Sequence, residues 1–170
     1  MTSGAIPQSL CHAFIALGSN LDQPTLQIRR AFAELSQLPA SRLLNCSAIY
    51  RSAPVGYLEQ PDFINAVVQV ETTLAPHDLL KSLLNIEQRF GRVRSTPNAA
   101  RILDLDLLLY ADLQCDEPGL TLPHPRMHLR AFVLKPLIEI APNCYIPGRG
   151  SVAEMLIACN GQQLERVISA

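Results

Sequence analysis

Strand-like and helix-like segments follow one another along this chain in an order that leaves few folds open. Residues 11–17 form a short apolar strand candidate, and residues 63–72 place Ala66, Val68 and Val70 on one face. The strands are connected as hairpin-like units and not as repeated strand–helix–strand crossovers. The sequence therefore predicts an α+β sandwich, with a mostly antiparallel sheet and helices packed on it.

The remaining elements follow from the same periodicities. We expect strands at 44–52 and 101–110, and helices with apolar residues at helical spacing from Ile28 to Leu35, from Pro76 to Phe90, around 132–140 and at 151–159. Two segments rich in turn formers, 52–62 and 91–101, are long enough to be functional loops.

Length and composition fit one globular domain with its own core. The chain has 170 residues, of which 48% are hydrophobic, and a formal net charge of -1. This charge gives no general attraction to nucleic acid, and no segment reaches the length of a membrane span. We expect residues 1–170 to form one monomeric domain, with residues 1–10 as a flexible extension and with no nucleic acid or membrane as partner.

The five cysteines are odd in number and scattered, without the C-x-x-C spacing of a zinc or redox site. Most have apolar neighbours, so we interpret them as reduced core residues of a cytoplasmic protein. The N-terminus also lacks the basic start and apolar run of a signal peptide.

Two acids lie one residue apart in the otherwise apolar stretch RILDLDLLLY. In a strand Asp104 and Asp106 point to one side, and Leu103, Leu105, Leu107 and Leu109 to the other, towards the core. Adjacent carboxylates repel each other unless a cation satisfies both, and Mg²⁺ in phosphoryl-transfer sites uses one or two carboxylates. A solvated strand face, or an ion pair with Arg101, would also explain this pattern.

Arginines gather in the loop before this strand, at Arg92, Arg94 and Arg101. Guanidinium groups form paired hydrogen bonds with phosphate, and phosphate also binds metal ions that carboxylates hold. The chain has no Walker A sequence, so it is not a P-loop enzyme. A solvated arginine loop is the alternative.

An aromatic ring and an amide share one face of the 63–72 strand, at Phe63 and Asn65. A flat heterocycle would use both, since the ring stacks on its face and the amide meets its edge. A core phenylalanine beside a loop-capping asparagine is the alternative.

Six segments together resemble one known family. They are GSN after the first strand, YRSAPVG, QPDFINA, IEQRFGRVR, RILDLDLLLY, and LTLPHPRM followed by RAFVLKPLIEIAP. Their order and approximate spacing resemble those of hydroxymethyldihydropterin pyrophosphokinase, a folate-pathway enzyme, from about Phe14 to Pro147. Each segment alone is a weak signal, whereas six in register are highly specific.

The resemblance implies transfer of pyrophosphate from ATP to the hydroxymethyl group of 6-hydroxymethyl-7,8-dihydropterin, with release of AMP, on a fold related to the ferredoxin-like sandwich. It also implies two Mg²⁺ ions as cofactors and ATP as co-substrate. It assigns catalysis to Arg92, Arg94, Asp104 and Asp106, of which the two aspartates are the metal ligands. It assigns ATP binding to Glu87, Arg92, Arg94, Arg101, Thr121, His124 and Arg130. It assigns pterin binding to Ser52, Ala53, Val55, Phe63, Asn65 and Phe132.

Two features leave alternatives open. The loop sequence STPNAAR has Pro97 and Asn98 where the family has an extra basic residue and an aromatic ring, which predicts weaker ATP binding. A catalytically weak pterin- or nucleotide-binding protein is therefore one alternative, and an RNA-binding module is another, although the chain has no Trp and only 5% aromatic residues. His124 lies between two prolines, where a rigid surface turn would also explain it.

Overall fold

The computed structural model of the chain describes residues 9–56, 58–91 and 100–168. The first eight residues of the predicted N-terminal extension lie outside the described part. Across the three described ranges, no helix combines the length and the apolar character that crossing a membrane requires.

The elements appear in the order strand, helix, then a run of strands interrupted by a second helix. The long strands are β1 (Cys11–Ser19), β2 (Ser41–Cys46), β4 (Phe63–Thr72) and β5 (Asp104–Tyr110). The short strands are β3 (Tyr50–Ser52), β6 (Cys115–Glu117), β7 (Leu120–Leu122), β8 (Tyr145–Ile146), β9 (Gly150–Ser151) and β10 (Leu164–Arg166). The helices are α1 (Pro24–Leu35), α2 (Pro76–Arg89), α3 (Ala131–Ile140) and α4 (Val152–Ala158), with a 3-10 turn at Met127–Leu129.

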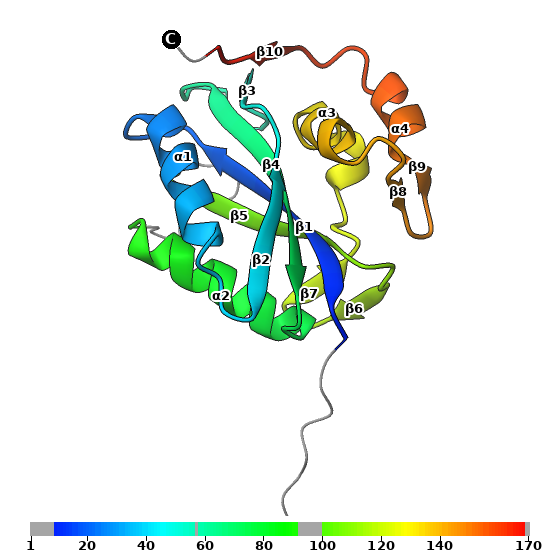
Figure 1. The fold of residues 1–170 in the computed structure, drawn as a ribbon. Helices are drawn as coiled ribbons and strands as arrows, with labels where there is room; N and C mark the ends of the chain where they lie inside the picture. Colours follow the sequence, from blue (N-terminus) through cyan, green and yellow to red (C-terminus); the bar gives the residue numbers. More distant parts are fainter. Residues whose placement is uncertain (1–8, 57, 92–99, 169–170) are drawn as a thin grey trace, which may run out of the picture.

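The main sheet has the strand order β10-β3-β4-β1-β5, with β2 also paired to β4. Every pair is antiparallel. Helices α1 and α2 lie on one side of this sheet, and α3 and α4 lie on the other (Figure 1). The α+β sandwich with a mostly antiparallel sheet is therefore confirmed.

The larger core lies between the sheet and the helices α1 and α2. Both helices begin with proline in the first turn, where no backbone hydrogen bond is lost, and each buries one apolar stripe. The stripe of α2 continues to Phe90, and Gly91 ends the helix with a φ of 85°. The predicted positions of both helices are confirmed.

A second core lies on the opposite face of the sheet, beneath α3 and α4. It joins Phe14 and Val67 to Val133, Leu134 and Leu137 of α3, among others. Because residues alternate across β4, Val67 faces this core while Ala66 and Val68 face the other. Asn65 lies on the same face as Val67, so the predicted faces of β4 are confirmed.

The predicted strand at 44–52 was wrong as a single element, because the chain breaks it at Ser47. Ser47 donates its backbone N–H to Val67 and accepts the Val67 N–H with its hydroxyl, at 2.9 Å each. The next amide, of Ala48, donates to Glu139 of α3 at 2.7 Å. A side chain thus replaces a backbone carbonyl in the ladder, and the chain divides into β2 and β3.

Leu109 does not share the face of Leu103, Leu105 and Leu107, which was also predicted wrongly. The pairing of β5 with β1 shifts register between Leu107 and Leu109, so Leu108 is an extra residue. Beyond this bulge the alternation is inverted, and Leu109 packs in the α3-side core.

The cysteines are free, although most are not core residues. Cys159 is buried, Cys46 is exposed, and Cys11, Cys115 and Cys144 are partly exposed. Their interpretation as core residues was therefore wrong for Cys46, whose direct neighbours Asn45 and Ser47 are polar.

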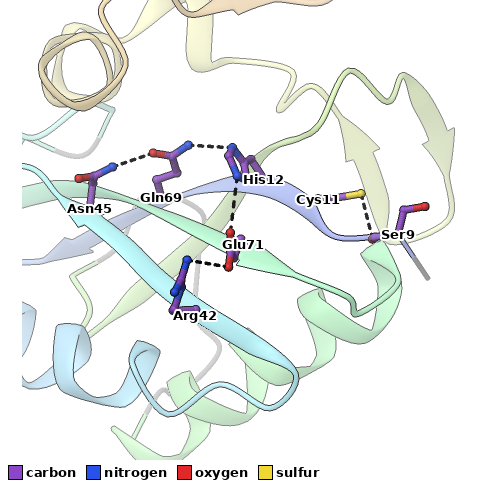
Figure 2. A network of polar contacts seen from close by, with 7 residues as sticks. All are labelled: Ser9, Cys11, His12, Arg42, Asn45, Gln69 and Glu71. Atoms are coloured by element: carbon purple, nitrogen blue, oxygen red, sulfur yellow. Dashed lines mark hydrogen bonds and ion pairs between the residues drawn. The ribbon is translucent and has the colours of Figure 1, made fainter. Parts of the chain in front are cut away.

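Part of the α3-side face is polar and open to solvent (Figure 2). The Asn45 amide donates to Gln69 at 2.9 Å, and Gln69 contacts the His12 ring at 3.3 Å. Glu71 lies 3.8 Å from His12 and 3.0 Å from Arg42. These residues lie towards the opposite ends of β1 and β4 from the site described below.

Candidate active site

The two acids of β5 lie side by side at the beginning of an edge strand. Asp104 and Asp106 are both part-buried, and Leu105 between them points into the α2-side core. The predicted common direction of the two carboxylates is therefore confirmed. Asp104 also forms an ion pair with Arg101 at 3.0 Å. The ion pair proposed as an alternative thus exists, at Asp104.

The pKa of Asp106 is raised from 3.8 to about 7. Burial is the largest cause, followed by the negative charge of Asp104 and a hydrogen bond with it. The positive charges of Arg130 and Arg101 act in the opposite direction but are not sufficient to keep the carboxyl ionised. Ionising both carboxyls at once therefore costs free energy in this site, and a bound cation would reduce that cost.

The donor set fits Mg²⁺ in a phosphate site. Within the described ranges, no group of three or more His, Cys, Asp or Glu side chains could enclose a metal ion. Two carboxylates from one strand match the usual protein share of a Mg²⁺ shell, whose other positions go to water and substrate phosphate. Asp104 and Asp106 would hold the metal in this way.

His124 is neutral in this site because burial and the charge of Arg130 lower its pKa to about 4. The backbone N–H of Arg126 donates to His124 Nδ1 at 3.2 Å, so the proton of the neutral ring is on Nε2. The backbone N–H of His124 donates to Leu108 O at 2.9 Å, which attaches this turn to β5. The histidine is therefore fixed beside the acids as a single N–H donor.

Arg130 immediately precedes α3 and reaches the same group of charges. Its charge influences Asp106, Asp104 and His124, and burial lowers its own pKa. Its guanidinium carbon lies 5.5 Å from the centroid of the Phe132 ring. One turn of chain thus places a predicted ATP residue against a predicted pterin residue.

Glu87 hydrogen-bonds to the backbone of β5 from helix α2. It lies on α2, is 1% exposed, and its Oε1 accepts the backbone N–H of Leu105 at 3.1 Å. Because β5 is the last strand of the sheet, its outer amides have no strand partner, and the buried carboxylate satisfies one of them. Glu87 thereby fixes the backbone between the two acids.

The predicted pterin residues Asn65 and Ser52 contact each other. The Asn65 side chain donates to Ser52 Oγ at 2.7 Å, and both residues are almost fully buried. Phe63 pairs with Ser52 in the ladder between β4 and β3 and is partly exposed. Asn65 is thus held in one orientation with its ring neighbour beside it.

The sheet places Gly18 between the acids and this amide. Gly18 pairs with Asp104 on one side and with Asn65 on the other. Neighbouring strands are about 4.8 Å apart, so the backbones of Asp104 and Asn65 are separated by about 10 Å. Ala16, two residues earlier, pairs with Asp106 and is also small. The floor between the two predicted subsites is therefore free of large side chains.

The sequence interpretation missed Asn20, which joins both predicted loops. Its side chain donates to Gln60 Oε1 at 2.9 Å and to Pro61 O at 3.0 Å, and accepts the Arg101 N–H at 2.9 Å. Its backbone N–H donates to Arg101 O at 3.1 Å, and the residue is 1% exposed. The GSN segment was used only as one of the six segments of the resemblance, and no role was assigned to Asn20. The signal was a polar residue directly after an apolar strand.

For the other predicted site residues, the structure gives no hydrogen bond or ion pair with the two acids or with Asn65 among the residues it describes. Thr121 donates its hydroxyl to Asp116 at 3.0 Å, and Ala53 and Val55 are exposed in the loop after β3. Arg92 and Arg94 lie outside the described residues, as do Pro97 and Asn98.

One family and several known proteins similar to this chain are described as the same enzyme. The family described as 7,8-dihydro-6-hydroxymethylpterin-pyrophosphokinase (HPPK) matches residues 14–142. A 2-amino-4-hydroxy-6-hydroxymethyldihydropteridine pyrophosphokinase of Pseudomonas aeruginosa is 43% identical over 157 residues, which cover 92% of this chain and 97% of that protein. The protein of that name from Haemophilus influenzae is 44% identical over 144 residues, with coverages of 85% and 90%.

Solved structures show the same fold. The crystal structure of wild-type HPPK-DHPS from Plasmodium falciparum with pteroate is similar at a TM-score of 0.71 and 13% identity. The match covers 91% of this chain and 43% of that one, so this chain spans less than half of the longer protein. At this identity the likeness concerns the fold alone.

Proposed function

This chain belongs to the 7,8-dihydro-6-hydroxymethylpterin-pyrophosphokinase family, and from its geometry we propose how its own residues carry out the reaction. It is a pyrophosphokinase of folate biosynthesis that uses ATP as co-substrate. The hydroxymethyl oxygen of the dihydropterin bonds to the β-phosphorus of ATP, and the bond from that phosphorus to the α,β-bridging oxygen breaks. AMP leaves, and the hydroxyl proton passes to solvent.

Asp104 and Asp106 would hold Mg²⁺, as two ions, beside the ATP phosphates. The chemistry that bound Mg²⁺ supplies is neutralisation and Lewis-acid polarisation of the transferred group. A bound cation would also offset the repulsion between the two aspartate carboxylates. The raised pKa of Asp106 is the observation that supports this assignment.

Positive charge and one neutral donor orient the phosphates. Arg101 and Arg130 contact them, together with Arg92 and Arg94 of the loop before β5 and with Thr121. His124 donates its Nε2–H to a phosphate oxygen, and because it is neutral it adds no charge that would compete with the metal. Glu87 keeps the strand between the acids in place for ATP.

The pterin lies on the same face of the sheet as the acids, over β4, two strands away from β5. Phe63 and Phe132 stack on its two faces, and Asn65, held by Ser52 at the end of β3, contacts its edge. Ala53 and Val55 of the following loop close over it. Gly18 supports this arrangement, because its missing side chain leaves room where the hydroxymethyl group meets the β-phosphate.

The observation that carries the proposal is the row Asp104, Gly18 and Asn65 across three neighbouring strands. The test is AMP release from Mg²⁺, ATP and 6-hydroxymethyl-7,8-dihydropterin. We expect AMP only when the pterin is present, loss of AMP release in Asp104→Asn, and normal release in Asp112→Asn, which alters an exposed acid after β5. AMP release at the same rate without the pterin, or pterin binding without AMP release, would contradict the proposal.

Residues 1–170 form one catalytic domain that works as a monomer in the cytoplasm. Free cysteines, including the exposed Cys46, suit a reducing compartment and support this placement. Light scattering of the purified chain tests the monomer, since a mass near twice 18.7 kDa would contradict it.

A further inference from the structure

One carboxamide holds the backbone on both sides of Arg130. Gln162 lies in the segment between α4 and β10, and its Oε1 accepts the Ala131 N–H at 2.9 Å. Its Nε2 donates to Leu129 O at 2.7 Å. The Leu129 carbonyl belongs to the peptide plane before the Arg130 Cα, and the Ala131 amide to the plane after it. The two contacts therefore fix φ and ψ of Arg130, which has an extended backbone of φ -119° and ψ 105°.

Arg130 needs such support because it occupies the N-cap of α3 without capping the helix. The first amides of a helix lack internal partners, and a short polar side chain at the N-cap usually satisfies one of them. An arginine has no acceptor, and no side chain at the N-cap of α3 makes a capping hydrogen bond. Gln162 supplies the missing acceptor from another part of the chain.

The segment that carries Gln162 is itself attached to this turn. The backbone N–H of Gln162 donates to Cys159 O at 3.0 Å, at the end of α4. The Cys159 thiol donates to His128 O at 3.8 Å, one residue before Leu129. The carboxamide is thus presented from a structured base, although Gln162 itself is solvent-exposed.

We propose that Gln162 is a positioning residue, which aims the Arg130 guanidinium at the ATP phosphates and Phe132 at the pterin by clamping the peptides on either side of Arg130. This inference rests on the proposed roles of Arg130 and Phe132. Because the guanidinium also lies over the Phe132 ring, a rotation about the Arg130 backbone displaces both side chains together. The clamp therefore links the affinities for the two substrates.

The test uses Gln162→Met, which keeps the length of the side chain and removes both hydrogen bonds. Gln163→Met is the matched control at the exposed neighbouring position. We expect the KM for ATP and the KM for the pterin to rise in Gln162→Met, with kcat/KM for ATP about tenfold lower, equal to about 1.4 kcal/mol. The control should retain wild-type constants. A merely structural role would reduce the active fraction, and hence kcat, at unchanged KM values.

A double-mutant cycle shows whether Gln162 acts through Arg130. The affinity for α,β-methylene ATP with Mg²⁺, measured by calorimetry, should fall in Gln162→Met and in Arg130→Ala. In the Arg130→Ala background, Gln162→Met should cause no further loss. Additive losses would overturn the proposal, as would wild-type constants in Gln162→Met.

A partial variant provides a second readout. Gln162→Glu keeps the acceptor for the Ala131 N–H and loses the donor to Leu129 O at neutral pH. It should therefore lie between wild type and Gln162→Met, and recover at acid pH, where the carboxyl again carries a proton to donate. Behaviour identical to Gln162→Met at every pH would contradict the two-point clamp. Failure of the wild type to release AMP would instead refute the proposed function.

Discussion

Replacing Asp106 with asparagine should stabilise the ligand-free protein at alkaline pH and leave it nearly unchanged at acid pH. In the folded chain the pKa of Asp106 is about 7, because burial and the charge of Asp104 favour the protonated carboxyl; its ordinary value is 3.8. Between these values the folded state keeps a proton that the unfolded state has released. Stability of the wild type therefore falls as the pH rises through this window, and the loss is complete above about pH 7.

The size of the effect follows from the pKa. A rise from 3.8 to about 7 corresponds to about 4 kcal/mol, at about 1.36 kcal/mol for each pH unit. Because the side chain is part-exposed, water screens the charge, and we expect about half of this, ~2 kcal/mol, in favour of Asp106→Asn near pH 8. The difference should become small near pH 4 and vanish below it, since the carboxyl is then protonated in the unfolded state as well as in the fold.

Urea unfolding in EDTA, without nucleotide, measures this difference near pH 4.5 and near pH 8. The control is Asp112→Asn, which removes an exposed acid from the turn after β5 and should give the same difference from wild type at both pH values. A stability gain of Asp106→Asn that does not change with pH would refute the reasoning. It would mean that the two carboxyls of β5 are not competing for a proton.

Three further predictions concern residues around the acids. Gly18→Val should fold, because a Cβ at Gly18 meets only Asn65 Oδ1 at 3.7 Å, and a melting curve tests this. The added side chain should fill the floor of the site and lower kcat/KM about 100-fold, which steady-state kinetics will measure. Asn20→Ala should raise the KM for both substrates and lower the free energy of unfolding by about 2–3 kcal/mol, because buried partners lose hydrogen bonds; unchanged urea midpoints would contradict this. The His124 ring should titrate near pH 4 in NMR spectra of the ligand-free protein, and a midpoint near its ordinary value of 6.5 would show that the ring is not buried beside Arg130.

Much of the fold follows from periodicity, because each long element has one apolar face. The α2 stripe and the two faces of β4 were predicted correctly for this reason. The inversion at Leu108 could not be predicted, since a run of three leucines contains no polar residue to mark which one is extra. The break at Ser47 was missed because it depends on Val67, which is distant in sequence.

Some residues of the candidate site could likewise be predicted from the sequence, and others could not. Asp104 and Asp106 could be placed on one side of a strand because alternation is local. The roles of Gly18 and Asn20 could not be assigned, because they depend on strands and loops that the sequence does not place beside them; for Asn20 the only signal in the sequence was a polar residue directly after an apolar strand. The clamp of Gln162 on Arg130 is also invisible in sequence, where 32 positions separate the two residues.

Anomalous diffraction from a crystal grown with Mn²⁺ and α,β-methylene ATP tests the central claim most directly. We predict metal peaks about 2.0–2.3 Å from carboxylate oxygens of both Asp104 and Asp106, bridged to the triphosphate. Peaks elsewhere, with these carboxylates contacted only by the guanidinium groups of Arg101 and Arg130, would contradict it.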